Sequence, residues 1–204
     1  MTYRRLAFLA ISLALPALSQ DIHLLTDTNS ESIGQVKDVR QLSATTHRVL
    51  ALDAHGALHE WRRATRTWQI VPNTPQDITK IAAGPNHTLL LTTDGAVWTA
   101  GQNTMGQLGD GTITTRATFQ KLENLPEIAD IDAGPDYSLA TDTSGRTWAW
   151  GANWTNLVPT ATAKAILTPQ PTLQSKHHHL RDLFRLPQLF AGHSLRQNRK
   201  HARL

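Results

Sequence analysis

The segment "TDGAVWTAGQNTMGQLGDGT", residues 93–112, places five glycines and a tryptophan between two apolar stretches. A phosphate-binding P-loop needs a Lys and then a Ser or Thr after its last glycine, but Gln107 and Leu108 follow Gly106. An EF-hand calcium loop needs oxygen ligands at alternate positions and a distant Glu, and only Asp110 stands near a suitable place. The explanation of these glycines has to come from the rest of the chain.

The pattern returns 50 residues further on. The segments "ITKIAAGPNHTLLLTTDGAVWTAGQN" (78–103) and "IADIDAGPDYSLATDTSGRTWAWGAN" (128–153) align without a gap, and both carry Ala-Gly-Pro and the same Gly, Trp and Asn positions. A repeat changes the meaning of every glycine in it, because the same structural unit then recurs along the chain.

A fainter copy occupies residues 39–61. In this copy, His47 lies 40 positions before His87, and Gly56 lies 39 positions before Gly95. The copy is about one residue short where the other two carry Ala-Gly, and it has lost that glycine.

Each unit is typical of β-structure. Runs such as "TLLLTT" and "AVWTA" have the length of strands, are bounded by glycine and lack a helical period. Asp94-Gly95 is a dipeptide that permits the positive φ angles of a tight hairpin, and Ser144-Gly145 is its counterpart.

Units of 40 to 50 residues built from short antiparallel strands indicate propeller blades. We therefore predict an all-β chain with a partial β-propeller over 36–174, made of two to three four-stranded antiparallel blades. The three repeats would occupy 36–76, 77–126 and 127–174, and the tail 175–204 would be irregular. The end blades of such an arc are expected to expose an unpaired strand and an apolar face, which favours self-association.

These motifs resemble the repeats of the regulator of chromosome condensation family, which join "AG..H" to "DG.V..WG.N..GQLG.G". Residues 78–112 match nearly throughout, whereas the third unit has Tyr137 for His87 and lacks the closing glycine loop. The resemblance implies a propeller and makes the glycines backbone turns and close contacts rather than ligand-binding residues. The repeat-motif residues are Gly84, His87, Asp94, Gly95, Trp98, Gly101, Asn103, Gly106, Gln107, Gly109, Gly134, Gly145, Trp148 and Gly151.

No catalytic constellation is visible, and we expect no catalytic, cofactor-binding or metal-binding residues. His55, His59 and Glu60 are close in sequence, but Gly56 falls at the hairpin turn, so the histidines flank a bend instead of sharing a helical face. His87 follows the repeat, which favours a structural hydrogen bond over catalysis.

Six tryptophans stand among 12 aromatic residues. Trp98 and Trp148 share one repeat position, and Trp61 and Trp150 share another, so packing is expected for all four. Trp68 and Trp154 lie outside the repeat frame, and we consider them for contact with a partner.

The N-terminus has the pattern of a secretory signal peptide. Arg4 and Arg5 precede an apolar run from Leu6 to Leu15, and Pro16 follows it. The run is shorter than the roughly 20 residues that span a bilayer, so a retained anchor is the weaker interpretation. We expect a signal peptide at 1–19, a secreted or periplasmic protein, and no membrane attachment after cleavage.

Charge is divided unevenly along the chain. Residues 20–174 carry 11 basic and 15 acidic side chains, whereas 175–204 carry seven basic residues and only Asp182. The acidic body makes nucleic acid an unlikely partner. The basic tail, with its His177–His179 run, is open to three interpretations: a solvated tail, a site for metal or polyanions, or the product of a frameshift in a longer gene.

The known roles of the resembled family are mostly recognition of other macromolecules through loops at one face of the ring. The resemblance therefore implies an exported, non-catalytic module that binds a protein of unknown identity. The alternatives are a truncated or frameshifted fragment of a longer propeller, and a secreted propeller-type hydrolase or lyase.

Overall fold

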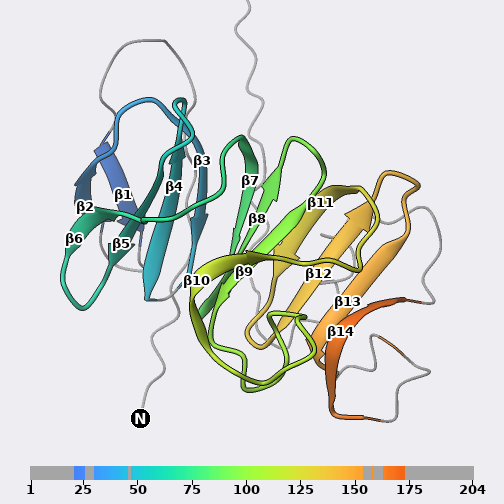
Figure 1. The fold of residues 1–204 in the computed structure, drawn as a ribbon. Coiled ribbons are helices and arrows are strands. Elements are labelled where there is room, and N and C mark those ends of the chain that lie inside the picture. Colours follow the sequence, from blue (N-terminus) through green and yellow to red (C-terminus); the bar gives the residue numbers. More distant parts are fainter. Residues whose placement is uncertain (1–20, 26–29, 46, 154–157, 159–162, 173–204) are drawn as a thin grey trace, which may run out of the picture.

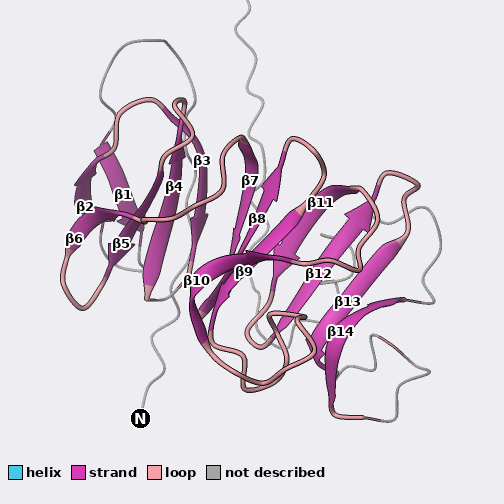
Figure 2. Ribbon diagram, viewed as in Figure 1, coloured by secondary structure: helices cyan, strands magenta, loops and turns pink. Residues whose placement is uncertain are grey.

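The computed structural model describes residues 21–25, 30–45, 47–153, 158 and 163–172, which contain fourteen strands and no helix (Figure 2). Twelve strands form three four-stranded antiparallel sheets, and the other two form a separate hairpin. The prediction of an all-β chain with four-stranded antiparallel blades is confirmed. The predicted signal peptide at 1–19, the tail at 175–204 and Trp154 lie outside the described residues.

Each sheet is a meander of consecutive strands, here called a blade. The first blade comprises β3 (Val39–Ala44), β4 (Arg48–Asp53), β5 (Leu58–Arg62) and β6 (Thr67–Ile70). The second comprises β7 (Ile78–Ala83), β8 (His87–Thr92), β9 (Val97–Gly101) and β10 (Arg116–Lys121). The third comprises β11 (Ile128–Ala133), β12 (Tyr137–Asp142), β13 (Thr147–Ala152) and β14 (Ala165–Pro171).

A glycine at positive φ turns the chain between the second and third strand of every blade. Gly56, Gly95 and Gly145 have φ of 84°, 73° and 83°, a region that side chains with a Cβ seldom adopt. The amide of Gly95 donates to the Thr92 carbonyl at 2.9 Å, which closes the hairpin. These three turns lie at the same end of the blades, so the topology gathers them on one rim.

The blades stand side by side (Figure 1). β3 and β4 of the first blade contact β7 of the second, and β7 and β8 of the second contact β11 of the third. The seam between the first and second blade is an apolar cluster of Leu50, Leu52, Leu58, Ile78, Ile81 and Leu90. Full burial of one such side chain contributes roughly 1.5–3 kcal/mol, so the seam joins the two sheets into one body.

The seam between the second and third blade is larger. Leu89, Leu91 and Val97 of the second blade meet Ile128 and Ile131 of the third. Leu89 and Leu90 are adjacent on β8 and both fully buried, since alternate side chains of a strand point to opposite faces. The second blade is therefore packed on both faces.

A hairpin that the sequence analysis did not predict covers the outer face of the first blade. It consists of β1 (Asp21–Leu25) and β2 (Ser30–Gln35). Ile22 and Ile33 of the hairpin pack against Val49, Ala51 and Trp61 of the blade. The expectation that this end blade exposes its apolar face was therefore wrong: a short local hairpin takes the place of a neighbouring blade.

Helices of membrane-spanning length and apolarity do not occur in the part of the chain that the structure describes.

Candidate functional site

The glycine-rich segment after β9 is a packed loop rather than a ligand cradle. Gly106, Gly109 and Gly111 all have positive φ, and their amides donate to the carbonyls of Asn103, Gly106 and Leu167. A Cβ at Gly106 would come within 2.7 Å of Leu167, and one at Gly109 within 2.8 Å of the Trp150 ring. Because their N–H groups are used and their α-carbons lie against the third blade, these glycines have nothing to offer a phosphate.

Asn103 holds this loop together from inside. Its side-chain Oδ1 accepts from the Leu108 amide at 2.8 Å. Its side-chain Nδ2 donates to the Asp110 carboxylate and to the Thr112 carbonyl, at 3.0 Å each. Asn153 occupies the same position one repeat later, and its side-chain Oδ1 accepts from the Val158 amide at 3.1 Å. The shared Asn therefore has a structural explanation in both repeats.

A buried chain of hydrogen bonds crosses from the second blade to the third. The Gln107 carbonyl accepts from the Ser138 hydroxyl at 2.8 Å and from Trp150 Nε1 at 2.9 Å. His87 Nε2 lies 3.0 Å from Ser138 Oγ. Since the hydroxyl gives its one hydrogen to Gln107, the imidazole is the donor to Ser138. This Ser–His pair is fully enclosed, so no substrate reaches it.

Arg48 is the equivalent of His87 in the first repeat. The Arg48 carbonyl accepts from Thr45, as the His87 carbonyl accepts from Gly84. The assignment of His47 to this position was therefore wrong, because the strand registers place the first two repeats at a constant offset of 39 from β3 to β5, without the gap before β4 that an offset of 40 requires. Arg48 also reaches the next blade, where its guanidinium donates to the Gly84 carbonyl at 2.8 Å and to the His87 carbonyl.

The electrostatics of this position follow from its burial. Burial, together with the nearby Arg48 cation, lowers the pKa of His87 to about 4. Burial also raises the pKa of Tyr137, the residue of the third repeat, to about 12, with a smaller contribution from Asp132. His87 is therefore neutral and Tyr137 protonated at neutral pH, and neither is poised for acid–base catalysis there.

Gly84 and Gly134 are needed for close approach, not for turns. A Cβ at Gly84 would lie 2.3 Å from the His87 ring, and one at Gly134 would lie 2.2 Å from the Tyr137 ring. The first repeat has Thr45 here, opposite the flexible Arg48 instead of a ring. The Ala-Gly-Pro motif is thus tied to the aromatic residue three positions later.

The His59 imidazole pairs with Asp53, 2.9 Å away, instead of joining a metal site. Burial raises the pKa of Asp53, but hydrogen bonds from His59 and from the amides of Ala57 and His55 outweigh it, so the pKa is lowered. In the third blade, Trp148 Nε1 donates to Asp142 at 3.0 Å from the equivalent position. His59 therefore replaces a tryptophan as the ring N–H donor.

Glu60 points away from these histidines. It lies on the opposite face of β5 from His59 and pairs with Arg48 and Arg62 at 3.2 and 2.8 Å. No group of three or more potential metal ligands occurs in the described ranges.

The tryptophans divide as follows. Trp61 and Trp150 are buried, and Trp98 and Trp148 are half-buried against the apolar clusters. Trp68 is half-buried on the β1–β2 hairpin, where its Nε1 donates to the Ile33 carbonyl at 2.8 Å. Its ring is thus engaged within the chain.

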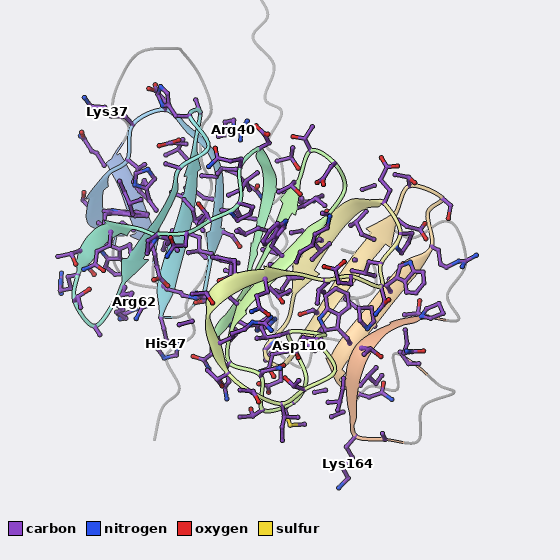
Figure 3. All side chains as sticks on the ribbon, in the orientation of Figure 1. Lys37, Arg40, His47, Arg62, Asp110 and Lys164 are labelled. Carbon is purple, nitrogen blue, oxygen red and sulfur yellow. The ribbon has the colours of Figure 1, made fainter. Side chains whose placement is uncertain are left out.

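A cleft of about 430 Å³ opens at the rim, over the seam between the first and second blade. Its walls are the β4–β5 turn and the connection from β6 to β7, and its floor includes Leu58 and Ile78. Arg40, Asp77 and the imidazole of His55 also line it. Figure 3 shows Arg40 at this rim, with His47 and Arg62 at the opposite end of the first blade. Sequence reasoning missed this cleft because its residues are scattered from 40 to 93.

Two sequence models of one family match the middle of the chain. Both are described as the regulator of chromosome condensation (RCC1) repeat, and they match residues 78–107 and 94–141. The chain carries RCC1 repeats. No curated protein matched this sequence.

Solved structures of RCC1-type propellers share the fold. The chain is 20% identical to yeast RCC1 (Prp20) in its complex with Kap60, at a TM-score of 0.61, over 72% of this chain and 39% of that one. A second structure is Prp20p of Saccharomyces cerevisiae, studied with its binding to Gsp1p and histones. It gives 19% identity and a TM-score of 0.61, covering 73% of this chain and 41% of that one. Human WBSCR16 gives 19% identity and a TM-score of 0.59, covering 65% of this chain and 39% of that one. The chain thus spans about two fifths of the length of these structures.

The cleft departs from the RCC1 repeat pattern of this chain at three positions. Strand register makes Thr79 and Ala129 the equivalents of Arg40, and Lys121 and Pro171 the equivalents of Ile70. At the turn, Asp94 and Ser144 are the equivalents of His55. The RCC1 fold therefore does not require Arg40, His55 or Ile70 for its own packing.

Proposed function

We propose that this chain is a protein-binding RCC1-repeat module that works through the rim carrying the β4–β5, β8–β9 and β12–β13 turns. The observation that carries the proposal is the open cleft at this rim, set over the apolar seam between the first two blades. A rigid scaffold with exposed loops at one end is the usual arrangement of a recognition surface. The yeast RCC1 structures, one bound to Kap60 and one studied for binding to Gsp1p and histones, support a protein as the kind of partner.

We propose further that the module has no catalysis of its own. The one Ser–His pair of the described residues, Ser138 and His87, supports this because both side chains have no exposed surface. A nucleophile must reach its substrate, and this hydroxyl is instead bonded to the Gln107 carbonyl.

Export is the third element of the proposal, and it rests on the sequence of residues 1–19. Two arginines followed by a ten-residue apolar run have the composition of a signal peptide. Cell fractionation of the full chain tests this directly. A variant in which Arg4 and Arg5 are replaced and Leu9→Arg interrupts the apolar run should stay in the cytoplasm. An unaltered chain found only in the cytoplasm would contradict export.

Photo-crosslinking in cells tests the binding role. A photoreactive amino acid placed at His55, Asp94 or Ser144, all exposed on the rim, should yield a discrete crosslinked protein. Matched control positions are Arg63 and Thr104, which are exposed at the opposite end of the blades. Equal crosslinking from both ends, or none from the rim, would count against the proposal.

A further inference from the structure

We infer that the cleft between the first two blades recognises an extended polypeptide segment of a partner protein, one that places an acidic side chain near an apolar one. Arg40 would pair with the acid, and Ile70 would receive the apolar side chain. This inference rests on the proposed protein-binding function and adds the chemistry of the partner.

Arg40 is a cation without an ion pair among the described residues. Its Nη2 donates to the Ile78 carbonyl at 2.7 Å, and the side chain is otherwise exposed. Asp77 lines the same cleft and forms no ion pair with it, although six ion pairs of Lys or Arg occur among the described residues. The bond to Ile78 fixes the guanidinium in place, so less freedom is lost when it takes a carboxylate on its remaining donors.

Ile70 supplies the apolar half of the surface. At 67% exposure it is the most exposed large hydrophobic side chain of the described residues. It belongs to β6, the outer edge strand of the first blade, and it lines the cleft mouth. Lys121 stands at the equivalent position of the second blade, so this exposure is not a property of the repeat.

The side chains at the rim of the first blade differ from those of the other two. Its turn carries His55 where the other blades have Asp94 and Ser144, and its inner strand carries Arg40 where they have Thr79 and Ala129. Asp77, in contrast, has the acidic counterparts Asp38 and Glu127 before β3 and β11. The residues peculiar to this cleft are therefore an arginine, a histidine and an isoleucine. Arginine is among the residues that most often dominate binding energy at protein interfaces, and Ile70 adds exposed apolar surface to the same cleft.

Selection from a phage-displayed library of random linear peptides tests the inference on the full chain. The unaltered protein should enrich peptides with Asp or Glu close to an apolar residue. An Arg40→Glu variant should exchange the acidic preference for Lys or Arg, and Ile70→Lys should remove the apolar preference. Each substitution should weaken binding of the best peptide by about tenfold or more, as expected for a central interface residue.

Arg63→Glu is the matched control, because it makes the same charge change at an exposed position of the opposite end. It should leave the selected peptides unchanged, and circular dichroism should show all variants folded. The inference is overturned if no peptide family is enriched, if Arg40→Glu leaves the acidic preference intact, or if Arg63→Glu alters it equally. Crosslinking from Asp94 and Ser144 with none from Ile70 would also overturn it, while leaving the protein-binding function standing.

Discussion

His87 Nε2 lies 3.0 Å from Ser138 Oγ, and this hydrogen bond joins the second blade to the third across a seam that excludes solvent. The imidazole is neutral here, because burial and the Arg48 cation disfavour a second positive charge. The seam therefore depends on the protonation state of one side chain.

Acid should destabilise the fold through His87. Its pKa is about 4 in the folded chain against 6.5 for a free histidine. Above pH 6.5 the side chain is neutral in both states. As the pH falls from 6.5 to 4, the unfolded chain takes up the proton and the folded chain does not, so about 3 kcal/mol of stability is lost. Urea unfolding at several pH values measures this loss.

A His87→Gln variant is the control for that titration. Glutamine keeps a hydrogen-bond donor but does not titrate, so its stability should fall less steeply between pH 6.5 and 4. Parallel pH profiles for the variant and the unaltered chain would show that another group is responsible.

Gly95→Ala should be more destabilising than Gly145→Ala, although the two glycines occupy the same repeat position. Both have positive φ, which costs an alanine about 1 kcal/mol. Only at Gly95 would the new Cβ meet neighbours, with Glu127 Cγ at 2.4 Å and the Ile128 amide at 3.1 Å, while nothing lies within 4 Å at Gly145. Urea midpoints compare the two, and equal midpoints would mean that Glu127 moves aside without cost.

His59→Trp should be tolerated, because the third blade uses Trp148 Nε1 in the same place. His59→Leu removes the N–H donor from Asp53, whose side chain is only 12% exposed, and should cost about 1 kcal/mol or more. Thermal melting at neutral pH distinguishes the two. A leucine variant as stable as the tryptophan variant would show that the Asp53–His59 bond contributes little.

The β1–β2 hairpin should act as a cap on the first blade. Ile33→Asp places a charge among Val49, Ala51 and Trp61, so the hairpin should detach and leave an apolar face that promotes association. Light scattering coupled to gel filtration should then show self-association. Ser32→Asp, on an exposed neighbouring side chain, is the control and should leave the size unchanged.

The repeat spacing was enough to predict the blades. Asp94-Gly95 and Ser144-Gly145 do form turns, and Trp61 and Trp150 do occupy one position, because turn chemistry and strand length are local properties. The same reasoning failed at His47, since sequence similarity placed a gap before β4, whereas the strand registers run at a constant offset of 39 from β3 to β5.

Long-range features were beyond the sequence. The β1–β2 hairpin lies outside the repeats, and its burial depends on the apolar face it meets. Gly106 and Gly109 lie close against Leu167 and Trp150 of the third blade, which are distant from them in sequence. The rim cleft needs Arg40 and Ile70 together, which only the stacking of two blades provides. A repeat residue without counterparts, such as Arg40, is the signal that could have been followed.

Hydrogen exchange of the full chain, with and without the partner captured by crosslinking, tests the binding role most directly. We predict that the partner slows exchange of amides at the rim, above all in 53–57 and 71–77, and leaves exchange in 62–67 and 102–104 at the opposite end unchanged. Protection confined to the opposite end, or no protection anywhere, would contradict it.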